Sequence, residues 1–156
     1  MPSDEEDKAA VVAPPPLIYL GPLIFGLLLN RRVPLLFLPR RIARSLGWPL
    51  LSGGVLLIGW FGSAMRHADI PASPYKPVSH MVTEGPFRYT RNPGHLAMTM
   101  IYTGIACLAN ALWAILLLPV VLLGIQRGVI EREERYLERK FGEEFLRYKA
   151  QVRRWI

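Results

Sequence analysis

Residues 85–97 read GPFRYTRNPGHLA, a polar and basic stretch that lies directly before a long apolar run. Its Gly-Pro and Asn-Pro pairs mark two turns, because proline fixes its own φ and restricts the residue before it. From Leu96 to Gln126 the chain is almost entirely apolar. We therefore expect a fixed polar loop at the edge of a membrane-embedded segment, serving either as a binding site or as a contact for lipid headgroups.

The composition favours a membrane-embedded helical bundle over a soluble globule. The chain has 156 residues, of which 51% are hydrophobic and 20% charged, and its net charge is +7. This length predicts a single domain. The first ten residues are acidic, the connections are basic, and charge is dense after Gln126. Because the basic residues adjoin apolar segments, we expect membrane lipids rather than nucleic acid as their partners.

The cysteine and histidine content argues against a disulfide or a metal site. Cys107 is the single cysteine and lies inside an apolar run, so we expect a buried, inert thiol. The three histidines show no metal-ligand spacing, and we expect no metal.

The apolar segments predict an all-α integral membrane bundle of about four transmembrane helices. We place the first two spans at residues 11–30 and 46–65, because crossing a bilayer takes ~20 mostly apolar residues. Residues 94–126 are predicted to form a helical hairpin with its tight turn at Asn110. The acidic start of the chain lacks the basic region of a signal peptide, so we expect no cleavage.

The whole chain, residues 1–156, is expected to form one membrane domain with its polar parts in the cytosol. Residues 66–93 are a predicted cytosolic loop, and we interpret the proline-rich part up to residue 84 as a functional lid. Residues 127–156 are predicted to form a cytosolic tail of amphipathic helices, interrupted at Gly142.

The basic residues give the bundle an orientation. The tail carries the larger basic cluster, which places it in the cytosol by the positive-inside tendency. Four spans then put the arginine-rich connection between residues 31 and 44 on the outside. Either this connection is an exception to the tendency, or the first segment does not fully cross the membrane.

A second polar cluster begins where the last apolar run ends. Arg127 and Glu131 are four positions apart, so they share one face of an α-helix. Ionisable residues at a membrane boundary are costly and often functional. The same stretch, EREERYLERK, is also typical of a solvated helix with ordinary ion pairs, and we favour that interpretation for residues 138–140.

Four motifs follow one another in the second half of the chain. They are the Arg-Asn-Pro loop at residues 91–93, the hairpin at 94–126, the Glu-Glu pair at 133–134, and the FGEEF segment at 141–145. In this order and spacing they resemble the isoprenylcysteine carboxyl methyltransferase and phospholipid N-methyltransferase family. That family carries an Arg-His-Pro-type loop, so Asn92 stands where the family has a histidine. The resemblance covers about half of the chain.

The resemblance implies an integral membrane methyltransferase that uses S-adenosylmethionine. The implied cofactor-binding residues are Tyr89, Arg91, Asn92, Pro93, His95, Glu133 and Glu134. Arg91 would bind the methionine carboxylate of the cofactor, and its ammonium would go to Glu134 as first choice and Glu133 as second.

The resemblance also implies catalytic roles for Arg127 and Glu131. Arg127 would orient an anionic acceptor head, while Glu131 would position Arg127 or accept a proton from the nucleophile. The implied acceptor is a lipophilic small molecule, such as a bacterial lipid or an isoprenoid-like acid. The expected location is a bacterial inner membrane.

Two other functions are compatible with the sequence. One is a membrane NAD(P)H-dependent reductase of related architecture. The other is a non-enzymatic small membrane protein that binds anionic lipid through its basic loops. The second predicts that Arg91 and Glu134 can be replaced by alanine without loss of ligand binding.

Overall fold

The computed structural model describes residues 11–70 and 78–156, and over these ranges it is helical without a strand. The elements are α1 (Pro15–Arg32), α2 (Arg40–His67), the 3-10 turn η1 (Gly85–Arg88), α3 (Pro93–Leu108), α4 (Leu112–Ile125), the π-helical turn η2 (Gln126–Ile130), α5 (Glu131–Phe141) and α6 (Glu143–Gln151). The all-α prediction is confirmed. Of the predicted lid, residues 71–77 lie outside the described part of the chain.

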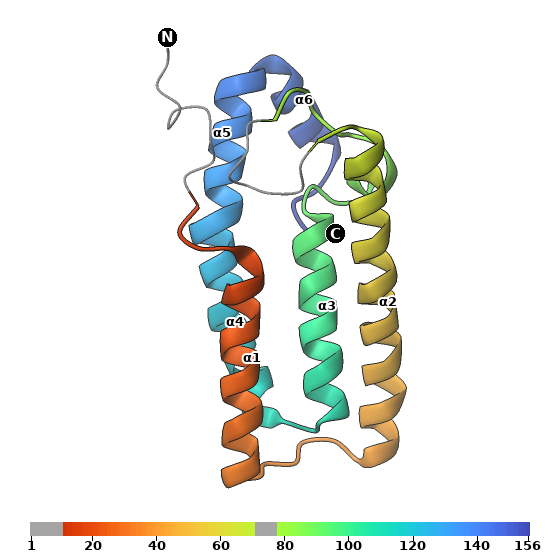
Figure 1. The fold of residues 1–156 in the computed structure, drawn as a ribbon, viewed down its shortest axis with the longest axis vertical. Helices are drawn as coiled ribbons and strands as arrows, with labels where there is room; N and C mark the ends of the chain where they lie inside the picture. Colours follow the sequence, from red (N-terminus) through yellow and green to blue (C-terminus); the bar gives the residue numbers. More distant parts are fainter. Residues whose placement is uncertain (1–10, 71–77) are drawn as a thin grey trace.

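Helices α1 to α4 run side by side along the long axis of the molecule, with α3 between α1 and α2 in the view of Figure 1. The most extensive contacts join α2 to α3 and α1 to α4. Glycine allows the first of these pairs to approach closely. A Cβ atom at Gly104 would lie 2.7 Å from the backbone nitrogen of Leu51, and one at Gly54 would lie 2.7 Å from Ile101 Cγ1.

The tight turn of the hairpin is confirmed. Helix α3 ends at Leu108, α4 begins at Leu112, and Asn110 between them has a φ of 48°. The Asn110 side chain also holds the α1–α2 connection: its Oδ1 accepts the N–H groups of Phe37 and Leu38 at 3.2 and 3.1 Å. Its Nδ2 donates to the Leu38 carbonyl at 2.7 Å. One residue thus fixes both connections at this end of the bundle.

The first two helices extend beyond the segments predicted as the first two spans. The connection between the first two helices covers only residues 33–39, because α1 continues to Arg32 and α2 begins at Arg40. Among the described residues, two helical stretches are long and apolar enough to cross a membrane: Arg40–His67, and Leu112–Phe141, which joins α4, η2 and α5. Helix α3 has 16 residues, about 24 Å at 1.5 Å per residue.

The polar elements gather at the opposite end of the bundle from Asn110. Figure 1 shows η1, the start of α3, α5 and α6 together there, with the C-terminus beside the start of α3. Gly142, with a φ of 49°, separates α5 from α6 as the sequence predicts. The chain can therefore turn back, so that its last residues reach the loop before α3.

Candidate functional site

A cavity of about 350 Å³ lies at the polar end of the bundle. Most of its wall is apolar, with Phe61 and Met65 from α2, Val82 from the loop before η1, and Phe145 from α6. Polar side chains from the start of α3, from α5 and from α6 complete it. A mostly apolar cavity with a few convergent polar groups is typical of a small-molecule site.

The loop on one side of this cavity is shaped by its glycine and prolines. Gly85 has a φ of 61°, which glycine adopts without strain, and η1 starts there. Pro93 occupies the first turn of α3, where its missing N–H costs nothing. The backbone N–H of Asn92 donates to Thr90 Oγ1 at 3.2 Å. Both predicted turns are present, and together they aim residues 91–95 at the cavity.

The end of the chain is hydrogen-bonded to this loop. The Arg91 N–H donates to the Arg153 carbonyl at 3.0 Å. Thr90 Oγ1 and Asn92 Nδ2 both donate to the Arg154 carbonyl, at 3.1 and 3.0 Å. Residues 152–156, which we call the C-terminal strap, are thereby fixed against the start of α3.

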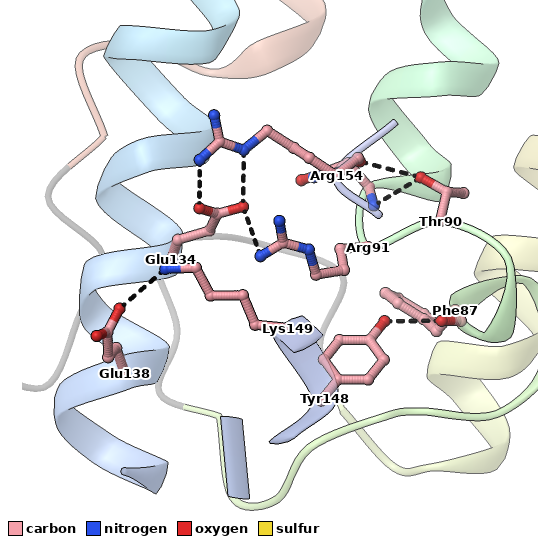
Figure 2. Close-up of polar contacts among 9 residues, drawn as sticks. Phe87, Thr90, Arg91, Glu134, Glu138, Tyr148, Lys149 and Arg154 are labelled. Carbon is pink, nitrogen blue, oxygen red and sulfur yellow. Dashed lines mark hydrogen bonds and ion pairs between the residues drawn. The ribbon is translucent and has the colours of Figure 1, made fainter. Parts of the chain in front are cut away.

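The carboxylate of Glu134 is shared by two guanidinium groups (Figure 2). Arg154 binds it in a bidentate manner, with Nε 3.0 Å from Oε1 and Nη2 2.7 Å from Oε2. Arg91 Nη1 lies 3.1 Å from Oε1. The hydrogen bond to Glu134 raises the pKa of Arg154 above its usual range. Glu134 is 8% exposed, and the three side chains together carry one positive charge in excess.

Two side chains at the cavity have buried nitrogens without a hydrogen-bond partner among the described residues. Arg91 Nε has none, and Arg91 Nη1 is near Glu134 but is not aligned for a hydrogen bond. His95 Nδ1 also has none, while His95 Nε2 lies 3.6 Å from Glu133 Oε2. Buried polar groups of this kind are costly unless something binds them. The Arg91 donors lie on the cavity wall and suit an anionic ligand.

Tyr148 joins α6 to the loop. Its hydroxyl donates to the Phe87 carbonyl at 2.7 Å (Figure 2). Burial raises the pKa of Tyr148 to about 12, and nearby Arg91 lowers it slightly against that effect. The hydroxyl therefore stays protonated and donating at neutral pH.

The structure brings most of the expected cofactor residues to one place. The cavity is lined by Arg91, Asn92, Pro93, His95, Glu133 and Glu134. Tyr89 is outside this lining: it is 71% exposed and its ring lies 6.1 Å from that of Trp60. Over the described residues, no group of three His, Cys, Asp or Glu side chains has the arrangement of a metal site.

The two expected catalytic residues also lie outside the cavity lining. Arg127 is exposed and belongs to the π-helical turn η2, whereas Glu131 begins α5. A π-helical turn closes hydrogen bonds five residues apart instead of four, so spacing across it does not follow the α-helical period. The expected pairing of Arg127 with Glu131 assumed an uninterrupted α-helix.

Sequence reasoning missed Arg154 and Tyr148. Arg154 stands in the terminal segment VRRWI, where it looks like the neighbouring Arg153 and like any basic tail. Tyr148 lies in the tail that the sequence predicts to form amphipathic helices, where an aromatic residue is ordinary. Nothing local in the sequence distinguishes either residue, because their partners are distant in sequence. Tyr148 binds Phe87, 61 residues away, and Arg154 binds Glu134, 20 residues away.

Comparison with known proteins gives one family and one short relative. A family model described as phospholipid methyltransferase matches residues 42–144, which is about two thirds of the chain. An uncharacterized protein of Haemophilus influenzae is 54% identical over 37 residues, covering 24% of this chain and 59% of that protein. No solved structure matches the chain significantly.

Proposed function

The chain belongs to the phospholipid methyltransferase family, and we propose from this that it transfers a methyl group from S-adenosylmethionine to a lipophilic acceptor in the membrane. One observation carries the proposal for the cofactor. Arg91 and Glu134 line the cavity and, with Arg154 behind Glu134, carry one positive charge in excess, while Nε and Nη1 of Arg91 are buried without a hydrogen-bond partner among the described residues. The amino-acid end of S-adenosylmethionine has a carboxylate that would satisfy both.

We assign the two charges of that amino-acid end to different residues. Arg91 would bind the carboxylate, because its Nε has no other partner among the described residues. Glu134 is already ion-paired with two guanidiniums, so Glu133 is the better partner for the ammonium. The Glu133 side chain is partly exposed at the cavity, with His95 beside it. This reverses the order of preference that the sequence suggested for the two glutamates.

The apolar wall of the cavity would hold the rest of the cofactor and the reacting end of the acceptor. Bound S-adenosylmethionine supplies a methyl group on a sulfonium, which an acceptor nucleophile takes as the carbon–sulfur bond breaks. Side chains such as Phe61, Met65 and Met98 exclude water and restrict the two reactants to one alignment. Pro15 and Pro16, at the start of α1, also line the cavity. The cavity is thus lined by residues of both α1 and α2, and we propose that an acceptor enters it sideways from the membrane.

Arg127 and Glu131 receive supporting roles in this proposal. Arg127 is exposed where apolar α4 gives way to charged α5, a position suited to the anionic headgroup of an acceptor or neighbouring lipid. Glu131 acts on Arg154 electrostatically and favours its charged form. We assign neither residue a proton transfer.

Family membership and two sufficiently long apolar helices indicate a membrane protein. We propose that α1 and α3 cross as well, because both run alongside α2 and α4 in the bundle in Figure 1. The cavity and the C-terminal strap lie at the same end of the bundle, so both would face one side of the membrane. That side would be the cytosol, where a polar cofactor is available, in a bacterial inner membrane.

Calorimetric titration of the detergent-purified protein with S-adenosylmethionine tests the cofactor proposal. The wild type should bind saturably, and Arg91→Ala should lose about tenfold or more in affinity, as expected for one charge-assisted hydrogen bond. Arg88→Ala is the matched control, because Arg88 is exposed and outside the cavity lining. A folded wild type without binding, or equal affinities in Arg91→Ala and wild type, would contradict the proposal.

A further inference from the structure

Arg154, in the C-terminal strap, is held at both its backbone and its side chain by residues that line the cavity, Asn92 and Glu134. Its carbonyl accepts from Thr90 and Asn92 in the loop before α3. Its guanidinium holds Glu134 on α5 with two hydrogen bonds. Arg153, by contrast, contacts the loop through its carbonyl. Arg154 therefore bridges two elements of the site that lie 20 and 62 residues away in sequence.

Arg154 and Arg91 share the carboxylate of Glu134 unequally. Glu134 has two carboxylate oxygens, and Arg154 donates a well-formed hydrogen bond to each of them. Arg91 is left with one ion-pair contact at 3.1 Å that lacks hydrogen-bond geometry. Without Arg154, the buried carboxylate of Glu134 would have Arg91 as its nearest cation and would draw its donors away from the cavity. The net charge of the Arg91, Glu134 and Arg154 side chains would also fall from one positive charge to zero.

We propose that Arg154 is a positioning residue that saturates Glu134 and so keeps Arg91 free to bind the carboxylate of the cofactor. This rests on the proposed function, and it makes the C-terminal strap a part of the cofactor site. Arg154 touches no reacting atom in this account. Its effect is restricted to the amino-acid end of the ligand, because its contacts are to Glu134 and to the loop that carries Arg91.

Two ligands separate this role from a general structural one. S-adenosylhomocysteine contains the amino-acid end, whereas 5′-methylthioadenosine lacks it and keeps the adenosine and thioether. In the wild type S-adenosylhomocysteine should bind more tightly than 5′-methylthioadenosine. Arg154→Ala should lower the affinity for S-adenosylhomocysteine by about tenfold or more, the loss expected for a charge-assisted contact. The same variant should change the affinity for 5′-methylthioadenosine by no more than about twofold, which is within the ordinary effect of a surface substitution.

A second-site variant tests the charge argument itself. In Arg154→Ala combined with Glu134→Gln, the carboxylate that would capture Arg91 is absent, and the net charge of the group returns to one positive. This double variant should recover part of the affinity for S-adenosylhomocysteine that Arg154→Ala loses. Arg153→Ala is the matched control and should bind both ligands like the wild type, since its contact to Arg91 is made by the backbone.

The measurement is calorimetric titration of each detergent-purified variant with both ligands, beside thermal unfolding without ligand. Selective loss for S-adenosylhomocysteine in Arg154→Ala, with partial rescue in the double variant, supports the inference. Equal losses for both ligands, or no rescue, would overturn it while leaving the proposed function intact. A folded wild type that binds neither ligand would overturn the proposed function and this inference together.

Discussion

The side-chain amide of Asn92 donates a 3.0 Å hydrogen bond to the carbonyl oxygen of Arg154, 62 residues later in the chain. Asn92 is buried, and its amide is used to hold the C-terminal strap against the loop. The family motif has a histidine at this position. In this chain the residue therefore acts in assembling the site, through a donor that an amide supplies without titrating.

Replacing Asn92 with alanine should loosen the strap. The Arg154 carbonyl would keep only its bond from Thr90, and the loss of one such bond costs about 1 kcal/mol. We expect Asn92→Ala to lower the unfolding temperature and to weaken S-adenosylhomocysteine binding several-fold. Asn30→Ala is the control, because Asn30 makes one exposed hydrogen bond at the far end of the bundle. Wild-type affinity in Asn92→Ala would show that the strap does not need this bond.

The raised pKa of Tyr148 predicts that the free energy of unfolding depends on pH in the alkaline range. Burial raises its pKa in the folded protein to about 12, above the ordinary value of 10.0. The folded state thus holds the proton more tightly than the unfolded state, so this contribution to stability is complete below pH 10 and is lost as pH rises towards 12. In Tyr148→Phe this contribution is absent.

The difference in free energy of unfolding between wild type and Tyr148→Phe measures this effect, since the other tyrosines cancel. It should be constant from pH 7 to 9, at about 1 kcal/mol for the lost hydrogen bond to Phe87. It should then shrink as the pH rises above 10. A difference that stays constant up to pH 11 would contradict the assignment.

Local sequence features predicted the parts of the fold that depend on a few neighbouring residues. The hairpin turn at Asn110 and the break at Gly142 follow from residues that adopt positive φ. The expectation that Arg91 and Glu134 lie in one site came from the order of four motifs, which resembles that of a known family. In each case the signal lies in residue type and order, which the sequence displays directly.

The features that sequence reasoning missed depend on tertiary contacts or on a change of helical period. The π-helical turn η2 alters the relation between Arg127 and Glu131, and a 3.6-residue pattern gives no sign of it. Tyr89 faces Trp60 instead of the cavity. Arg154 differs from Arg153 only in where the folded strap places its side chain. No local pattern encodes that placement.

The proposed orientation can be tested with single cysteines at the two ends of the bundle. Leu36 and Ile156 are 76% and 79% exposed, and they lie in the α1–α2 connection and the C-terminal strap. In intact cells, a membrane-impermeant maleimide should label Leu36→Cys, whereas Ile156→Cys should be labelled only after permeabilisation. The native Cys107 is buried and serves as the unlabelled background. The reverse pattern would place the cavity outside the cytosol.

The most direct test of the account is transfer of a radioactive methyl group. Membranes containing the protein are incubated with methyl-labelled S-adenosylmethionine, and the organic-extractable lipids are separated and counted. The wild type and Arg88→Ala should place label in a discrete lipophilic product, and Arg91→Ala should form about tenfold less of it when S-adenosylmethionine is below the wild-type Kd. No labelled product from membranes that contain the folded wild type and its native lipids would contradict the central claim.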